Sequence, residues 1–165
     1  MSLSPTPLPP ALAQRYPVLV AAQIQGHEDS YVAQSARAVA LALEGYGLRV
    51  QLVGALDDVE TAFRADPGFS CVILGWGPCE QDLDKAQQVI RLMRRRTAQL
   101  PIMLGMSKAH HGQVPLAFVE EIDGFIWLPE DSPEFIAGRI AAAAHRYLDT
   151  ILPPFFGALV NFADT

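Results

Sequence analysis

Four arginines crowd one short stretch of the chain, at Arg91, Arg94, Arg95 and Arg96. On a helix their guanidinium groups repel one another unless an anion or an acidic surface lies against them. We therefore take the four as candidate residues for contact with an anionic effector or with a neighbouring subunit. A solvated helix face is the alternative interpretation.

The other polar clusters have simpler interpretations. His110 and His111 are adjacent, and adjacent residues rarely ligate one metal ion, so a solvated loop is expected there. The run 27–29 (His-Glu-Asp) is typical of a helix start, where acidic groups complement the helix dipole. Cys71 lies inside an apolar run and is expected in the core. We predict no catalytic, cofactor-binding or metal-binding residues in this chain.

Composition excludes several classes of protein. The 165 residues are 50% hydrophobic and 18% charged, which is typical of a folded domain with a sizeable core. The net charge of -6 argues against a nucleic-acid or anionic-membrane partner, because no basic footprint is available. No apolar run reaches transmembrane length, and two cysteines give no disulfide framework, so a cytoplasmic protein is predicted.

Short apolar runs alternate with helical patterns from residue 17 onward. Such alternation predicts right-handed crossovers and a parallel sheet with helices on both faces. Five units of this length predict a flavodoxin-like α/β fold, doubly wound with strand order 2-1-3-4-5. The predicted strands cover residues 17–22, 48–53, 71–76, 101–106 and 124–128, and the predicted helices cover 30–45, 57–66, 81–97, 114–121 and 133–151.

Three of these helices have clear inward faces. Asp29 or Ser30 is expected as the first N-cap and Ser132 as the last, and Pro133 then occupies the first helical position. The residues expected to face inward are Val32, Ala36, Val39 and Leu43; Leu83, Ala86, Ile90 and Met93; and Ile136, Ile140, Ala144, Tyr147 and Ile151.

The arrangement resembles the receiver domains of response regulators. Receivers need an acidic pair after strand one, an aspartate ending strand three, a serine or threonine after strand four and a lysine after strand five. At these places the chain has Gln23-Ile24, Gly75-Trp76, Ser107 and Leu128-Pro129. Without the carboxylates there is no group to phosphorylate and little to hold Mg²⁺, so a receiver-shaped domain without phosphoryl chemistry is expected.

The end of the chain carries a second, more specific resemblance. The stretches "DGFIWLPEDSPEFIAGRI" (123–140) and "YLDTILPPFFGALVNFADT" (147–165) are similar to the bacterial pyridoxal-phosphate-dependent ornithine, lysine and arginine decarboxylases. The resemblance implies a receiver-like N-terminal "wing" domain at 17–150. It also implies a linker at 151–165 that leads into a catalytic core. Residues 1–16, with four prolines, are expected to be a flexible leader.

The linker pattern itself agrees with this implication. Two prolines break the preceding helix, and the second can start a new one whose apolar side chains lie on two faces. Such a helix is expected to be buried between two bodies, which makes the missing catalytic core its partner. The residues of this core-docking helix are Pro153, Pro154, Phe155, Phe156, Leu159 and Phe162.

The resemblance also implies what the chain does and lacks. The family's proline-glycine-histidine segment and Schiff-base lysine are absent, and the only lysines are Lys85 and Lys108. Pyridoxal phosphate is therefore expected in the parent enzyme and not in this chain. The implied role is assembly of a homo-oligomer, with an anionic nucleotide effector nearby, in a parent acting on arginine first, then lysine or ornithine. The alternatives are a stand-alone pseudo-receiver that binds a protein partner, and a small enzyme or flavin binder that uses the flavodoxin fold.

Overall fold

The computed structural model describes residues 14–22, 29–65, 68–75 and 80–152, except for the side chains of 80–83. Five strands form one parallel sheet in the order β2-β1-β3-β4-β5, which confirms the predicted topology. The strands are β1 (Val18–Ala21), β2 (Val50–Val53), β3 (Cys71–Gly75), β4 (Ile102–Met106) and β5 (Gly124–Trp127). The helices are α2 (Tyr31–Gly45), η1 (Leu56–Asp58), α3 (Val59–Ala65), α4 (Glu80–Arg96), η2 (Lys108–Gln113), α5 (Leu116–Val119) and α6 (Pro133–Ile151).

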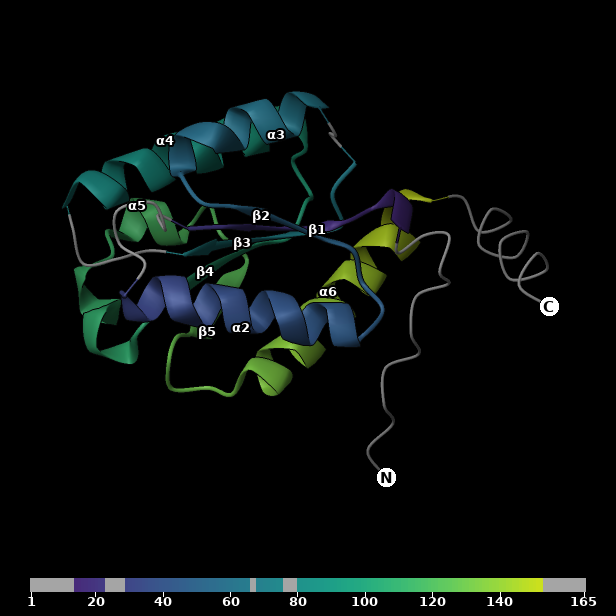
Figure 1. Ribbon diagram of the computed structural model, residues 1–165. Helices are drawn as coiled ribbons and strands as arrows, with labels where there is room; N and C mark the ends of the chain where they lie inside the picture. The colour runs from purple at the N-terminus through teal and green to yellow at the C-terminus, as the bar shows by residue number, and fades with distance from the viewer. Residues whose placement is uncertain (1–13, 23–28, 66–67, 76–79, 153–165) are drawn as a thin grey trace.

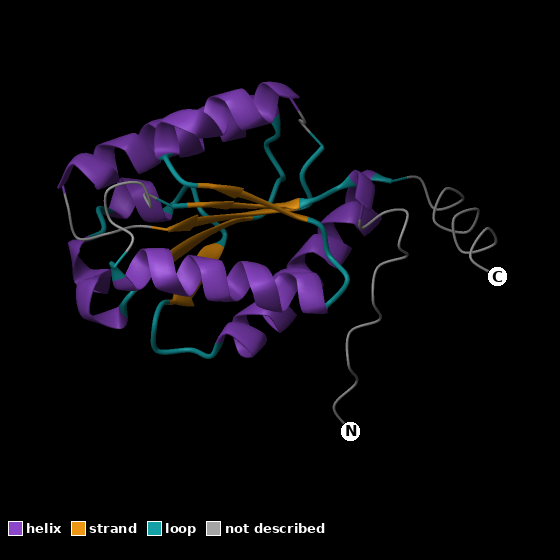
Figure 2. Ribbon diagram, viewed as in Figure 1, coloured by secondary structure: helices purple, strands orange, loops and turns teal. Residues whose placement is uncertain are grey.

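Two apolar layers enclose the sheet. Figure 1 shows α3 and α4 over one face and α2 and α6 over the other, and Figure 2 shows the strands between them. Phe63, Ile90 and Phe118 are buried in the first layer, and Val39 and Ile140 in the second. The central strands β1, β3 and β4 are buried on both sides, as their continuous apolar runs predict. Each large buried side chain contributes about 1.5–3 kcal/mol to folding.

The helix ends follow the capping rules. The Ser30 Oγ accepts a hydrogen bond from Ala33 N at 3.1 Å, and the Ser132 Oγ accepts one from Phe135 N at 3.1 Å. The predicted inward faces are buried where the structure describes them, with one exception: the prediction for Ile151 is wrong, because 41% of this residue is exposed at the end of α6. No helix in the described ranges is long and apolar enough to cross a membrane.

The segment between β4 and β5 differs most from the sequence prediction. A helix over 114–121 was expected, but the structure has η2 at Lys108–Gln113 and a single turn, α5, at Leu116–Val119. Pro115 explains the break, since it is the N-cap of α5 with extended backbone angles, and a proline without an N–H group cannot continue the preceding helix. Ser107 caps η2 by accepting a hydrogen bond from Ala109 N at 3.2 Å.

The chain enters and leaves the sheet at the same edge. Tyr16 stands just before β1, and Tyr147 lies in the last turns of α6. Tyr147 belongs to the apolar layer against which Tyr16 packs. Figure 1 shows α6 ending beside the start of β1. The carboxyl ends of the strands lie at the opposite edge.

Candidate functional site

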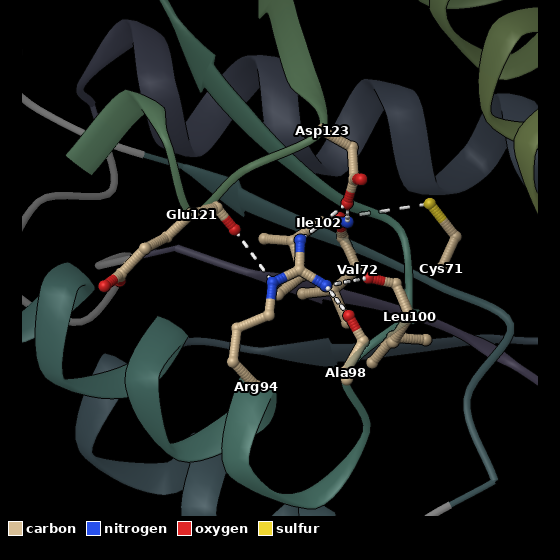
Figure 3. A network of polar contacts seen from close by, with 8 residues as sticks. All are labelled: Cys71, Val72, Arg94, Ala98, Leu100, Ile102, Glu121 and Asp123. Atoms are coloured by element: carbon tan, nitrogen blue, oxygen red, sulfur yellow. Dashed lines mark hydrogen bonds and ion pairs between the residues drawn. The ribbon is translucent and has the colours of Figure 1, made fainter. Parts of the chain in front are cut away.

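Arg94 lies at the centre of an intramolecular network. Its Nε donates to the Glu121 carbonyl at 2.8 Å, and its Nη1 donates to the carbonyls of Ala98 at 3.0 Å and Leu100 at 2.7 Å. Its Nη2 pairs with the Asp123 carboxylate at 2.7 Å. Figure 3 shows the guanidinium surrounded by these acceptors. Four of its five N–H groups thus form hydrogen bonds. Through them Arg94 links α4 to the loops that lead into β4 and β5.

The other three arginines of the quartet face outward. Arg91 Nε lies 3.7 Å from Glu121 Oε1, and 59% of the Arg91 side chain is exposed. Arg95 and Arg96 are exposed and form no ion pair within the described ranges. Arg91, Arg95 and Arg96 are here called the α4 arginine surface. The four arginines therefore differ in role. Arg94 stabilises the fold through internal contacts, and the other three have exposed side chains that a partner can reach.

Two hollows flank this surface. One, of about 520 Å³, is lined by Arg91, Arg94, Arg95, Glu120 and Glu121. The other, of about 350 Å³, lies between η1, α3 and α4, and its charged lining residues are Asp57, Glu60, Lys85 and Arg95. Arg95 borders both hollows, so it is the arginine best placed to reach a bound anion or an opposing subunit.

At the carboxyl edge of the sheet, where a receiver holds its phosphoryl group, the residue after β4 is hydrogen-bonded to the loop after β5. Glu130 Oε1 accepts hydrogen bonds from Ser107 Oγ at 2.6 Å and from Lys108 N at 2.8 Å. Ser107 N also donates to the Tyr31 hydroxyl at 3.4 Å. Burial acts to raise the pKa of Glu130, but the hydrogen bonds from Ser107 and Lys108 outweigh it, so the pKa is lowered and the carboxylate stays ionised.

The end of β3 has no room for the missing aspartate. A Cβ atom at Gly75 would lie 2.9 Å from Ala22 Cβ and 2.9 Å from Val32 Cγ1. Any side chain at this position would overlap α2 or the residue after β1. Trp76, Gln23 and Ile24 lie outside the described residues. No group of three or more histidine, cysteine, aspartate or glutamate side chains capable of holding a metal ion occurs in the described ranges.

Cys71 and the two lysines do not provide a reactive site. Cys71 is fully buried, and burial, together with the charge of Asp123, raises the pKa of its thiol to about 12. Lys85 Nζ pairs with Asp57 at 3.0 Å, and Lys108 Nζ lies 5.9 Å from the centre of the Trp127 ring. Neither amine stands free in an enclosed cavity as a Schiff-base lysine requires, so the described residues do not fit pyridoxal phosphate.

A small aromatic cluster on β5 was not predicted from the sequence. The His111 ring meets Phe125 edge-on, with centroids 4.9 Å apart, and meets Trp127 at 5.4 Å. The rings of Phe125 and Trp127 are parallel, with centroids 5.4 Å apart. The alternation of Phe125 and Trp127 along one strand was the available signal, since residues i and i+2 share a face. The segment around His111 is solvent-exposed as predicted, but it forms η2 and not an irregular loop.

The predicted ends of the chain cannot be placed. The leader, apart from Gln14–Tyr16, lies outside the described residues, and so does the core-docking helix from Pro153 to Phe162. Both stay predictions. The boundary between the wing domain and the linker at residue 150 is also untested, although α6 itself runs to Ile151.

The fold is that of a receiver-like domain. A receiver domain from Clostridium thermocellum superimposes with a TM-score of 0.61, at 12% identity, over 82% of this chain and 99% of that one. Lysine decarboxylase A from Pseudomonas aeruginosa superimposes with a TM-score of 0.70, at 27% identity, over 89% of this chain and 20% of that one. The first similarity shows the fold alone, because the sequence identity is only 12%. The second combines the same fold with 27% sequence identity.

Sequence comparison identifies the family. The profile described as "Orn/Lys/Arg decarboxylase, N-terminal domain" matches residues 31–147, and the chain belongs to this family. The biodegradative arginine decarboxylase of Escherichia coli K12 is 28% identical over 140 residues, which cover 84% of this chain and 18% of that protein. Lysine decarboxylase LdcA of Pseudomonas aeruginosa is 28% identical over 153 residues, which cover 89% and 20%. The chain thus spans about a fifth of the length of these relatives.

Proposed function

We propose that this domain is non-catalytic and serves the assembly and regulation of a cytoplasmic, pyridoxal-phosphate-dependent amino-acid decarboxylase. The observation that carries the proposal is a contrast between the polar groups at the carboxyl edge of the sheet and those on α4. At the carboxyl edge, where this fold usually does its chemistry, Ser107 is hydrogen-bonded to Glu130 and β3 ends in a glycine. Three exposed arginines instead lie on the α4 arginine surface, where a neighbouring subunit or an anion can meet them.

The parent enzyme carries the chemistry in this proposal. Relatives that act on arginine and on lysine are both 28% identical to this chain, so identity does not separate the substrates. We place arginine first, before lysine and ornithine. The cofactor and its lysine belong to the catalytic core that follows the linker helix at 151–165. The test is the natural gene: an open frame past Thr165 with a proline-glycine-histidine segment and a Schiff-base lysine is expected, and a stop codon there favours the stand-alone pseudo-receiver.

The assembly role is tested by charge reversal on the parent enzyme. Arg91→Glu combined with Arg95→Glu is expected to shift sedimentation toward smaller assemblies, because the surface then repels an acidic partner. Arg37→Glu is the matched control, since Arg37 is an exposed helical arginine on α2, on the opposite face of the sheet. Equal sedimentation of all three proteins would contradict a role for the α4 arginine surface in assembly.

The effector role has a separate test. Guanosine tetraphosphate is a suitable probe, because its phosphates match the guanidinium geometry of Arg95 and Arg96. Calorimetric titration is expected to show binding that Arg95→Ala/Arg96→Ala abolishes. Arg94 is unsuitable for this test, since its removal also breaks the network with Asp123. Absent binding, or binding that the double variant leaves unchanged, would reject the effector and leave the assembly role standing.

A further inference from the structure

A separate cavity of about 280 Å³ lies at the amino edge of the sheet. It is bounded by the C-terminal half of α6 on one side and by the segments entering β4 and β5 on the other. The residues that matter for its chemistry are Gln99, Met103, Asp123, Arg146, Tyr147 and Thr150. This site is distinct from the α4 arginine surface and from the carboxyl edge.

The cavity carries one group of each charge. Asp123 Oδ2 is engaged by Arg94 Nη2 and by Ile102 N, each at 2.7 Å. Its other oxygen, Oδ1, has no hydrogen-bond partner among the described residues, so half of the carboxylate remains available. The Arg146 guanidinium, which reaches the cavity from α6, makes no ion pair or hydrogen bond in the part of the chain that the structure describes.

The inner wall is apolar apart from one hydroxyl. Met103 and Tyr147 are each 8% exposed, and Ala143 is 4% exposed. The Tyr147 hydroxyl makes no hydrogen bond to any described residue. Burial raises the pKa of Tyr147, so this hydroxyl keeps its proton and can donate. An available donor beside an apolar wall is typical of a small-molecule site, where a few polar groups orient the ligand.

We propose that this cavity binds a free α-amino acid as the zwitterion. The ligand carboxylate would accept from the Arg146 guanidinium and the Tyr147 hydroxyl, and the ligand ammonium would donate to Asp123 Oδ1. A simple anion would pair only with Arg146 and a diamine only with Asp123, whereas a zwitterion can pair with both. The volume is slightly below the range of about 300–1,000 Å³ that is usual for ligand pockets, which favours a molecule of amino-acid size over a nucleotide.

Because of the position of the cavity, a bound ligand would affect the end of α6. Thr150 lines the cavity, and α6 ends one residue later at Ile151. A ligand held between Asp123 and Arg146 would join the last turns of α6 to the start of β5. Occupancy would therefore stabilise the point at which the chain leaves the domain. The binding itself does not depend on the proposed assembly role.

The test is a heteronuclear NMR titration of the 165-residue chain. Glycine, L-lysine and L-arginine are the probes, with acetate and 1,5-diaminopentane as ligands that carry only one kind of charge. Amide shifts are expected at Met103, Asp123, Tyr147 and Thr150 with the amino acids and not with the two controls. No shift at these residues up to about 20 mM, which corresponds to affinities too weak to matter, would overturn the proposal, and so would equal binding of diaminopentane or acetate.

Two variants make the test specific. Arg146→Gln is expected to weaken amino-acid binding at least about tenfold, because it removes a charged hydrogen bond. Tyr147→Phe is expected to weaken binding less, since it removes only a neutral donor. Arg37→Gln is the matched control, an exposed helical arginine outside the cavity, and should bind as the unchanged chain does. Unchanged binding by Arg146→Gln would overturn the proposal.

Discussion

Arg94 and Asp123 join α4 to the start of β5 through an ion pair of 2.7 Å between Nη2 and Oδ2. The two residues are far apart in sequence, and the same guanidinium also binds the carbonyls of Ala98, Leu100 and Glu121. Only 21% of the Arg94 side chain is exposed, so solvent does not readily replace these contacts.

The first prediction concerns this ion pair. Arg94→Ala should lower the free energy of unfolding by about 2–4 kcal/mol, because three carbonyls and a carboxylate lose their charged donor. Arg95→Ala, one residue away and exposed, should change it by no more than about 0.5 kcal/mol. Urea unfolding followed by circular dichroism measures both, and equal effects would show that the network does not stabilise the fold.

The second prediction concerns the end of β3. Gly75→Ala should destabilise the domain by about 1–3 kcal/mol, since the new methyl group overlaps Ala22 and Val32. Gly75→Asp should be worse, because it adds a buried carboxylate without a partner. Gly45→Ala is the control: nothing lies within 4 Å of a Cβ atom there, so its melting temperature should stay the same or rise. A Gly75→Ala protein that melts with the unchanged chain would contradict the predicted overlap.

The third prediction follows from the missing phosphoacceptor at the end of β3. Incubation with labelled acetyl phosphate and Mg²⁺ should leave no stable label on the chain, because neither Gly75 nor Ser107 can form an acyl phosphate. A phosphorylatable receiver treated in parallel provides the positive control. Stable, acid-resistant and base-labile labelling would reveal a carboxylate nucleophile elsewhere and refute the prediction.

The fourth prediction is a pH dependence. Because the pKa of Glu130 is lowered from 4.5, its carboxylate stabilises the fold above pH 4.5, and this contribution is lost as the pH falls through the lower, folded-state pKa. Glu130→Gln keeps an acceptor for Ser107 and Lys108 but does not titrate. The unchanged chain should therefore be more stable than the variant near about pH 7, and the difference should shrink toward about pH 3. A constant difference over that range would show that Glu130 is not responsible.

The fifth prediction concerns the buried thiol. In a Cys79→Ser background, Cys71 should resist iodoacetamide in the native protein, because burial raises its pKa to about 12 and leaves almost no thiolate. Urea should expose the thiol and restore ordinary reactivity. Mass spectrometry after timed quenching measures the rate. Rapid native modification would mean that β3 opens readily.

The fold could be predicted almost completely from the sequence. The strand order and the alternation were readable because parallel strands buried on both faces give continuous apolar runs, as in the stretch from Cys71 to Gly75. Caps such as Ser30 and Ser132 were readable because their chemistry is local. The prediction of one helix over 114–121 was wrong. It rested on apolar periodicity alone and did not take account of Pro115, after which α5 begins.

The site was harder to predict, because its contacts join distant residues. Nothing local in the sequence distinguishes Arg94 from Arg95, and only the packed fold brings Asp123 and the carbonyl of Leu100 to Arg94. The same holds for Glu130, which meets Ser107 across a loop. The cavity between Asp123 and Arg146 also depends on the packing of α6 against the sheet.

The presence of Tyr16 and Tyr147 in one apolar layer, with α6 ending beside the start of β1, has a consequence for protein engineering (Figure 1). A domain whose described ends are neighbours is topologically close to a ring, so a short peptide joining residue 152 to residue 14 should close it without moving a strand. New ends could then be opened at the exposed turn around Gly112, where nothing packs against the glycine. Such a circular permutant would keep the order of the strands in the sheet. Its new ends would lie at the carboxyl edge, so a fused protein would be attached there and no longer at the amino edge.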